Sequence, residues 1–466
     1  MRVQYSKRIF TMSIFLLSIT TAGIRNLDSE QRIDFYSKSS LRRFDPTRER
    51  VRGIYGPNGS GKTSFMLSMW VVSQLFLDPG FIQKQGTDYF ADLFTQRPTG
   101  PREFSFSCEF LSYIEHSNRS YEVDGVYKYD LTLGLDVECR ITNEKLSYLG
   151  NRNKHDSWVT VFESRNGRVE NLSINALSGS RNQIMDLMQN VVAKTCYLNA
   201  LRNAIRQLGL TRLITDGDML HKSDRALVDA VYFFKSISVR IMEDDIHTEK
   251  TASTRKHIDD LFQLEPQIFK ERIAESFTLK EDEVLIPRDE YENYKSFLKR
   301  AALFIKAFKP GLVDIVPDAT EKGDSYKCKT IFVYENSRID LSNESAGIRK
   351  LFTLFGDVAN VASGGGILFI DELDAHLSSI FLKEIVDLVT EFGNGQLVFT
   401  CHSLDPMHSL AGLKKSLYFL AEGKQAFVWT KNAHYKPYIA YPEGKIPGLS
   451  FSSLAETLKE SLLKVD

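Results

Sequence analysis

Apolar residues follow different patterns along this chain, and each pattern predicts a different kind of structure. Two short runs, Ile367–Ile370 and Gln396–Thr400, are largely apolar, and a glycine stands directly before each of them. Such runs are typical of strands that are buried on both faces of a parallel sheet. Between residues 104 and 172 apolar and polar positions alternate, with turn residues between the segments, which predicts an antiparallel meander. We therefore expect an α/β chain with a parallel or mixed central sheet, flanking helices and an antiparallel β-lobe.

From about residue 180 to residue 308 the apolar positions recur at steps of three and four, which predicts helices. The pattern does not sustain the heptads of a coiled coil, and Pro266, Pro287 and Pro310 divide it into pieces. We expect a helical insertion domain over residues 181–310, between an N-terminal half (1–180) and a C-terminal half (311–466) of the α/β unit. Near the start, two strands joined around "RNLDS" are expected to lead into a third strand, "RVRGIY".

The stretch "GIYGPNGSGKTSF" (residues 53–65) has the spacing G-x-x-x-x-G-K-T, directly after a predicted strand and before an apolar helix. Glycines let successive backbone N–H groups point into one concavity, and the positive end of the helix dipole adds to the attraction for phosphate. Lys62 is expected to reach the β- and γ-phosphates, and the Thr63 hydroxyl to coordinate Mg²⁺. The residues expected to line the nucleotide are Gly56, Pro57, Asn58, Gly59, Ser60, Gly61, Lys62, Thr63 and Ser64.

Two acidic residues, Asp371 and Glu372, follow the apolar run at 367–370. An aspartate at the carboxyl end of such a strand can hold Mg²⁺ through water, and the adjacent glutamate can act as general base for the attacking water. His402 follows the next predicted strand, so it is expected at the same edge of the sheet, where it can donate to the γ-phosphate. These residues predict ATP and Mg²⁺ as ligands, with Glu372 and His402 as the catalytic residues.

A third motif, "ESAGIRKL", begins an amphipathic pattern that has Leu351, Phe352 and Phe355 on one face. Ser345 and Gly347 therefore stand at the N-terminus of a predicted helix, and a Ser-x-Gly sequence in that position is another arrangement that binds phosphate. The alternative is that Ser345 only caps the helix and that the glycine is incidental. The residues by themselves leave both interpretations open.

The composition narrows the class of protein. At 466 residues, with 42% apolar and 26% charged residues, the chain is long enough for two or three domains' worth of core, and its net charge of −1 excludes a globally basic nucleic-acid binder. Basic residues cluster at "SLRRFDPTRERVR", but acidic residues interleave with them, so a solvated loop is favoured over a DNA contact. Five scattered cysteines without C-x-x-C spacing favour a reducing cytoplasm over a disulfide framework or a zinc site.

The first residues, "MRVQYSKRIFTMSIFLLSITTAG", have the layout of a secretory signal, with a basic start, an apolar run and small residues after it. Thr11 and Ser13 break the apolar run, and a motif that needs cytosolic nucleotide follows closely, so two strands are favoured, with Met12 as an alternative start. No other apolar stretch approaches the ~20 residues that a membrane span requires. A cytoplasmic location without a membrane partner is therefore expected.

The order of these motifs carries a resemblance to a known family. A P-loop, then "ESAGIRKL", then "LFIDELDAHL", then "VFTCHS" resembles the ABC-type ATPases of the SMC, recombination-repair and OLD-like group, in particular the AAA family ATPases of bacterial anti-phage defence. In size and layout the chain looks like the ATPase subunits of PARIS defence systems, with the Septu ATPases as a near alternative. The resemblance covers roughly residues 13–110 and 335–430. It implies the fold of an ABC-type P-loop ATPase head.

The resemblance also implies roles for particular residues. Ser345 and Gly347 would complete the ATP site of a second subunit bound head to tail, and Asp374 in "DELDAHL" would lie in the D-loop across that interface. Gln96 in "LFTQRPTG" is the candidate for a Q-loop glutamine at the metal. The family signature usually has the form L-S-G-G-Q, whereas this chain has N-E-S-A-G-I and keeps only the Ser-x-Gly spacing.

By resemblance, the chain would be an ATP-hydrolysing sensor or scaffold that assembles with itself, holds a separate Toprim-type nuclease effector, and responds to a phage-encoded trigger protein. The segment after His402 looks too short and too poor in acidic residues to hold a nuclease site of its own, so none is expected. The first alternative is a RecF/SMC-like DNA-repair ATPase, for which DNA would be a partner bound in a salt-sensitive way. A small-molecule P-loop kinase is a second alternative, which the acidic pair and the histidine disfavour.

Overall fold

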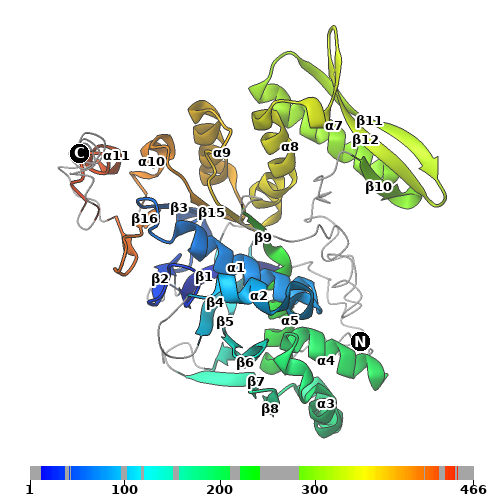
Figure 1. Ribbon diagram of the computed structural model, residues 1–466, viewed down its shortest axis with the longest axis vertical. Coiled ribbons are helices and arrows are strands. Elements are labelled where there is room, and N and C mark those ends of the chain that lie inside the picture. Colours follow the sequence, from blue (N-terminus) through cyan, green and yellow to red (C-terminus); the bar gives the residue numbers. More distant parts are fainter. Residues whose placement is uncertain are drawn as a thin grey trace, which may run out of the picture.

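The computed structural model describes residues 12–36, 41, 43–95, 102–116, 120–150, 157–209, 221–241, 283–413, 415–429, 436–446 and 449. These residues form three sheets, with helix α1 between the central sheet and a large antiparallel sheet, and a smaller sheet that projects from the body (Figure 1). The α/β class expected from the sequence, with a mixed central sheet, flanking helices and an antiparallel β-lobe, is confirmed.

The central sheet has six strands in the order β17-β16-β3-β15-β14-β9. All neighbouring pairs are parallel except β16 and β17, which form a hairpin. Both apolar runs singled out in the sequence are strands of this sheet. The strands are β3 (Val51–Tyr55), β9 (Ile237–Arg240), β14 (Ile367–Ile370), β15 (Gln396–Thr400), β16 (Leu417–Phe419) and β17 (Phe427–Val428).

Strand β14 shows why the sheet is buried on both faces. Because successive side chains of a strand point to opposite faces, Ile367 and Phe369 enter one core while Leu368 and Ile370 enter the other. The first core contains α1 (Lys62–Leu77) and the antiparallel sheet. The second core contains α8 (Ala346–Ala359), α9 (Ser379–Phe392) and α10 (Asp405–Leu410). Helix α1 therefore lies between two sheets and is buried along most of its length.

The antiparallel sheet has the order β2-β1-β4-β5-β6-β7-β8, and it confirms the meander predicted from the alternating pattern. The two strands expected on either side of "RNLDS" are β1 and β2. A short helix, α2 (Phe81–Leu93), joins α1 to this sheet. The strands are β1 (Met12–Ala22), β2 (Gln31–Asp34), β4 (Arg102–Glu115), β5 (Tyr121–Leu135), β6 (Cys139–Leu149), β7 (Trp158–Arg165) and β8 (Arg168–Leu172).

A buried glutamine joins the two large sheets. The side chain of Gln396, at the start of β15, accepts a hydrogen bond from the Leu16 N–H (2.7 Å) and donates one to the Leu16 carbonyl oxygen (3.1 Å). The pairing of β1 with β4 shifts register between Leu16 and Ser18, so a bulge stands at this point of β1. Gln396 thus satisfies both backbone groups of a residue beside the bulge and fixes the edge of the antiparallel sheet to the central sheet.

The region predicted as a helical insertion contains α3 (Arg181–Met188), α4 (Tyr197–Gln207), α5 (Lys222–Ser236) and α7 (Tyr291–Phe308). One part of that prediction is wrong. The three- and four-residue pattern predicts a helix through "ISVR", but this segment forms β9 (Ile237–Arg240), which pairs with β14 at the edge of the central sheet. The helices α3, α4 and α5 share a core with the antiparallel sheet. The proposed domain boundaries at 180 and 310 stay predictions.

A third sheet, which the sequence pattern did not reveal, has the order β10-β12-β11, with β13 also paired to β12. Helix α7 packs on one face of this sheet, and Figure 1 shows the unit projecting beside α8. Its strands are β10 (Glu283–Pro287), β11 (Leu312–Lys322), β12 (Ser325–Tyr334) and β13 (Arg338–Asp340). The last described helix is α11 (Pro437–Ala440).

All five cysteines are buried free thiols. No helix among the described residues has the length and apolar character of a membrane span.

Glu144, on β6, is completely buried and stands at the N-terminus of α4. Its carboxylate accepts hydrogen bonds from the Tyr129 hydroxyl (2.9 Å) and from the Tyr197 N–H (2.9 Å). Burial raises the pKa of Glu144 to about 8, and the two hydrogen bonds only partly oppose this rise. The folded state therefore binds a proton at Glu144 more tightly than the unfolded chain does.

We predict that Glu144 makes the protein less stable at alkaline pH. Its contribution is fully present below the unfolded pKa of 4.5 and is lost as pH rises through about 8. Glu144→Gln keeps one of the two acceptor oxygens and, like the protonated carboxyl group, carries no charge, so its melting temperature should exceed that of the wild type by several degrees at pH 8.5 but not at pH 5. Thermal unfolding at both pH values measures this, with the exposed Glu103→Gln as control. Parallel pH profiles for all three proteins would contradict the prediction.

Candidate nucleotide-binding site

The P-loop runs from the end of β3 at Tyr55 to the start of α1 at Lys62. Gly59 and Gly61 have φ angles of +79° and +96°, which favour glycine over residues with a side chain. A Cβ atom on Gly56 would lie 2.4 Å from the carbonyl oxygen of Leu420, so the close approach of the β16–β17 hairpin also requires glycine there. Gly59 and Gly61 are therefore required by their positive φ angles, and Gly56 is required by the lack of space for a side chain.

The Lys62 ammonium is hydrogen-bonded to the backbone of the P-loop itself. It donates to the carbonyl oxygens of Gly56 (2.9 Å) and Pro57 (3.1 Å). Burial lowers the pKa of Lys62, while the nearby carboxylates of Asp371 and Glu372 oppose that shift. The structure thus brings the P-loop lysine and the acidic pair, about three hundred residues apart in the sequence, to one edge of the central sheet.

Strand β15 lies between the P-loop strand β3 and the strand β14 that carries the acidic pair. At its carboxyl end, the Thr400 hydroxyl donates to Asp371 Oδ1 (2.5 Å) and accepts from the Glu372 N–H (2.7 Å). The Asp371 N–H donates to the carbonyl oxygen of Arg240 at the end of β9 (2.8 Å). Both acids are therefore positioned by the neighbouring strands on either side of β14.

The remaining oxygen of Asp371 supports the expectation of a divalent cation. Asp371 is 4% exposed, and its Oδ2 is buried without a hydrogen-bond partner among the described residues. A buried carboxylate oxygen is costly to leave unsatisfied, and hard oxygen donors are what Mg²⁺ prefers. Asp371 fits the predicted role, and the Thr63 hydroxyl, in the first turn of α1, would be the second protein ligand. Magnesium held there would neutralise charge on the β- and γ-phosphates.

Glu372 has an unusual backbone conformation. Its φ angle is +48°, in the left-handed region that is uncommon for a residue with a side chain. Besides the bond from its N–H to Thr400, its carbonyl oxygen accepts from the Lys350 ammonium (2.7 Å), which also donates to the Ala375 carbonyl oxygen (2.8 Å). Burial lowers the pKa of Lys350 to about 8. The backbone of the predicted base is thus held by a strand on one side and by helix α8 on the other.

Asp374 fixes the loop that carries His402. Its Oδ2 accepts from the backbone N–H groups of His402 (2.9 Å) and Ser403 (2.8 Å). The His402 side chain itself is exposed at the end of β15. A contact of Asp374 with a second subunit stays a prediction, and within this chain its carboxylate positions the histidine loop.

Ser345 is the N-cap of α8, and its hydroxyl accepts from the Ile348 N–H (3.5 Å). The capping role and the phosphate-binding role weighed from the sequence do not exclude each other, because Ser345 is also exposed. A Cβ atom on Gly347 would lie 2.7 Å from the His376 carbonyl oxygen, so α8 contacts the segment after Asp374 closely here. Gln96 lies outside the described residues, so its predicted role at the metal is not placed.

Two residues of the site were missed in the sequence, Asn26 and Lys350. Asn26, in the turn between β1 and β2, donates to the Gly59 carbonyl oxygen and accepts from the Ser64 hydroxyl (2.6 Å). The adjacent Leu27 packs against Gly61. The only signal was the polar turn "RNLDS" just before the P-loop strand. Lys350 follows the Ser-x-Gly motif by one helical turn, and nothing in its spacing indicates a contact with Glu372.

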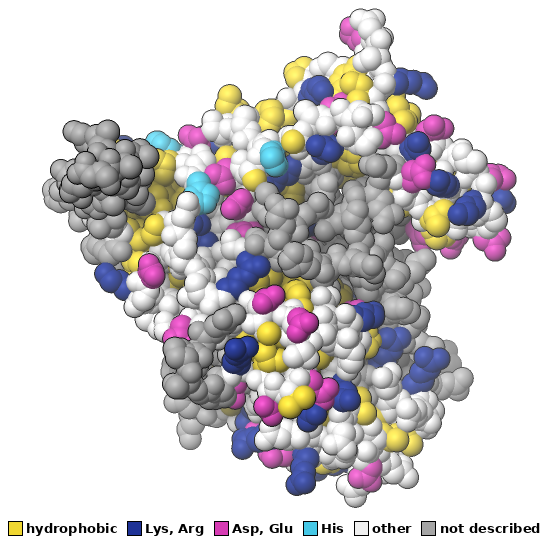
Figure 2. Space-filling view, viewed as in Figure 1, with side chains coloured by type: hydrophobic (Ala, Val, Ile, Leu, Met, Phe, Trp, Pro, Cys, Tyr) yellow, Lys and Arg dark blue, Asp and Glu magenta, His cyan; other side chains and the backbone are white. Residues whose placement is uncertain are grey.

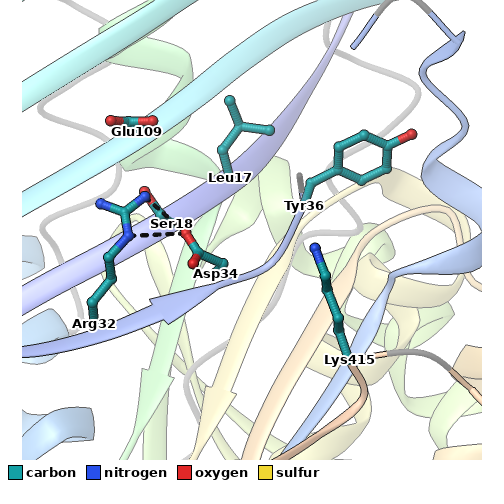
Figure 3. Close-up of a pocket in the computed structure, with 7 residues that line it drawn as sticks. All are labelled: Leu17, Ser18, Arg32, Asp34, Tyr36, Glu109 and Lys415. Carbon is teal, nitrogen blue, oxygen red and sulfur yellow. Dashed lines mark hydrogen bonds and ion pairs between the residues drawn. The ribbon is translucent and has the colours of Figure 1, made fainter. Parts of the chain in front are cut away.

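A separate cavity of about 130 Å³ lies on β1, β2 and the loop before β16 (Figure 3). The Arg32 side chain lines this cavity. Its Nε and Nη2 atoms both donate to Asp34 Oδ1, at 3.0 and 2.7 Å. Lys415 enters from the loop before β16. The cavity is lined by Leu17, Ser18, Arg32, Asp34, Tyr36, Glu109 and Lys415. None of the predicted nucleotide residues is among them.

Comparison with known proteins gives one family match. Residues 330–405, which contain α8, the acidic pair and His402, match the family model described as "AAA domain, putative AbiEii toxin, Type IV TA system". No curated protein matches the chain.

Among solved structures, the chain is similar to SMC head domains. One is an "SmcHead bound to the C-winged helix domain of ScpA", at 14% identity and a TM-score of 0.41, covering 90% of this chain and 98% of that chain. A second is an Smc head with an extended coiled coil bound to the C-terminal domain of ScpA from Pyrococcus furiosus, at 13% identity and a TM-score of 0.39, covering 90% and 96%. A third is an SMC head from Thermotoga maritima, at 13% identity and a TM-score of 0.28, covering 89% and 99%.

The P-loop, the acidic pair held by Thr400 and the match of residues 330–405 to an AAA domain together support a nucleotide-dependent ATPase role for this chain.

We predict that Lys350→Met lowers ATP turnover at least tenfold while ATP affinity changes less than threefold. The variant removes a charged hydrogen bond to the Glu372 carbonyl oxygen but leaves the P-loop intact. Phosphate release and nucleotide titration measure the two effects. Arg349→Met, at the exposed neighbouring position, is the control and should behave like the wild type. Unchanged turnover in Lys350→Met would show that Glu372 does not depend on α8.

Proposed function

We propose that this chain binds ATP at the carboxyl edge of the central sheet and hydrolyses it to ADP and phosphate. The observation that carries the proposal is the convergence of Lys62 with Asp371 and Glu372, both acids being positioned by the Thr400 hydroxyl. The P-loop and its lysine would bind the β- and γ-phosphates. Glu372 would take a proton from the water that attacks the γ-phosphate, while His402 would donate to the same phosphate from the end of β15.

We further propose that the ATP site is completed by a second copy of the chain. Ser345 stands exposed at the N-terminus of α8, where backbone N–H groups without partners in the helix can bind a phosphate. Ser345 and Gly347 of one copy would bind the γ-phosphate held by the P-loop of the other. A nucleotide placed between two copies makes assembly depend on ATP, and hydrolysis would release it.

The finer role that we propose is defence against phage, in which the ATP-bound assembly holds a separate nuclease effector and releases it when a phage-encoded trigger protein binds. Residues 330–405 match a family whose description names a toxin and a type IV TA system, which is in keeping with this role. The proposal assigns no nuclease chemistry to this chain.

The alternative role is that of a DNA-repair ATPase, which would need basic side chains that can contact a phosphate backbone. Arg52, one member of the basic cluster near the P-loop, is completely buried, and its guanidinium donates to the backbone of Val51 (2.9 Å) and to Glu49 (3.1 Å). It is therefore not available to a phosphate backbone. Over the face in Figure 2, basic and acidic side chains are interspersed rather than gathered into a stripe of one sign.

We predict that Glu372→Gln protein doubles its mass when ATP and Mg²⁺ are added, because ATP is bound but not hydrolysed. Adding Ser345→Arg to this variant should keep it monomeric while ATP still binds, since a bulky cation replaces the cap that faces the second copy. Light scattering after size exclusion measures the mass, and fluorescence titration the binding. Ser363→Arg, exposed beyond the far end of α8, is the matched control. Lys62→Ala should bind no ATP and stay monomeric.

If Glu372→Gln keeps one mass with and without ATP, or if Ser345→Arg assembles as well as the Ser363→Arg control, the composite site is wrong. If Glu372→Gln or Lys62→Ala hydrolyses ATP like the wild type, the assignment of the catalytic site itself is wrong.

We predict that tagged Glu372→Gln protein, purified from its native host in ATP-containing buffer, carries a nuclease-like protein in stoichiometric amount. Mass spectrometry identifies the partner, and the Lys62→Ala protein is the control that should lose it. Recovery of DNA with repair proteins, in place of such a partner, would favour the DNA-repair alternative.

A further inference from the structure

The last described elements of the chain return to the P-loop. Helix α11 packs on α10, where the rings of His408 and Tyr438 stack with centroids 3.6 Å apart at an angle of 22°. Ala440, Ile446 and Leu449 are buried in the core that lies under α8, α9 and α10. This segment is thus packed into the same core as α8, α9 and α10.

Tyr441, directly after α11, contacts the strand that leads into the P-loop. Its ring stacks on Phe419 of β16 (centroids 5.6 Å apart, 27°) and meets Tyr55 edge to face (6.2 Å, 67°). Tyr55 is the last residue of β3 and immediately precedes Gly56, the first glycine of the P-loop. The aromatic contacts therefore place the Tyr441 ring at the point where the strand becomes the phosphate-binding loop.

The hydroxyl of Tyr441 lies near the loop as well, because the backbone of Gly56 is one of the groups that act on its pKa and opposes the rise caused by burial. Burial raises the pKa of Tyr441 to about 12, so the hydroxyl is neutral at physiological pH. The Leu420 carbonyl oxygen also lies close to Gly56, 2.4 Å from where a Cβ would be. Residues of the β16–β17 hairpin and Tyr441 thus both lie at the start of the P-loop.

Gly56 in turn holds the P-loop lysine, since its carbonyl oxygen accepts from the Lys62 ammonium at 2.9 Å. We propose that Tyr441 is a positioning residue for the nucleotide: it fixes the backbone of Gly56 and, through it, the place of the Lys62 ammonium. Tyr441 does not touch the nucleotide itself. The inference rests on the proposed ATPase function and extends it to the C-terminal part of the chain, which none of the sequence motifs covers.

The same segment also reaches the other side of the site. Helix α10, on which α11 stacks, begins at Asp405, and Asp405 Oδ2 accepts from the hydroxyl of Ser403, next to His402 (3.1 Å). The pair α10 and α11 therefore spans from the loop that carries His402 to the first glycine of the P-loop.

The test compares three variants of the full chain. Tyr441→Phe keeps the ring and removes the hydroxyl, Tyr441→Leu removes both, and Tyr438→Phe is the control because Tyr438 stacks on His408 away from the P-loop. Loss of the interaction between the hydroxyl and the Gly56 backbone should raise the Kd for a fluorescent ATP analogue and the KM for ATP about fivefold in Tyr441→Phe. In the same variant kcat and the melting temperature should match those of the wild type. Tyr441→Leu should raise Kd further, and Tyr438→Phe should leave it unchanged.

Two results would overturn the role of Tyr441 in a wild-type protein that binds and hydrolyses ATP. One is a Kd in Tyr441→Phe equal to that of the wild type. The other is a fall in both kcat and melting temperature while KM stays unchanged. That result would mean that Tyr441 only stabilises the hydrophobic core. If the wild type neither binds nor hydrolyses ATP, the proposed function fails instead, so the two failures are distinguishable.

Discussion

The hydroxyl of Thr400 is the contact on which the acidic side of the site depends. A hydroxyl has one proton to donate, and here it goes to Asp371, while an oxygen lone pair receives the Glu372 N–H. One side chain thus sets the orientation of the predicted metal ligand and the backbone of the predicted base. This is geometrically available only because β15 lies between β3 and β14. The strand order, rather than any one motif, brings Thr400 next to both acids.

The P-loop is supported in a corresponding way by segments that lie far apart in the sequence. Asn26, from the turn between β1 and β2, binds the Gly59 carbonyl oxygen and the Ser64 hydroxyl, so it braces the middle of the loop and the start of α1. The carbonyl oxygen of Leu420, from the β16–β17 hairpin, lies close to Gly56 at the start of the loop. Because α1 is buried between two sheets, the helix behind the loop has little freedom to move. A rigid loop preserves the concavity that phosphate binding needs. The same close contacts require glycine at the positions where other backbone groups approach the loop.

The sequence was sufficient where a local pattern determines the structure. The glycine spacing of the P-loop and the apolar run before Asp371 each depend on residues that are neighbours along the chain, and both were predicted at the right positions. It failed for β9, because a strand of four residues at a sheet edge, with only Ile237 buried, is too short to separate a period of two from the helical pattern before it. It also failed for Lys350, whose role depends on a turn 22 residues away that folds against α8.

The strained backbone of Glu372 is held by two different elements, and one of them carries the residue proposed to contact a second copy. A glutamate in the left-handed region is strained by about 1 to 3 kcal/mol, and such a conformation persists only where its surroundings hold it. The two groups that do so here belong to different elements, Thr400 to the rigid sheet and Lys350 to α8. The N-terminus of α8 carries the exposed Ser345, only a little more than one helical turn before Lys350. Any displacement of α8 that accompanies contact at Ser345 therefore moves one of the two supports of Glu372 and leaves the other in place.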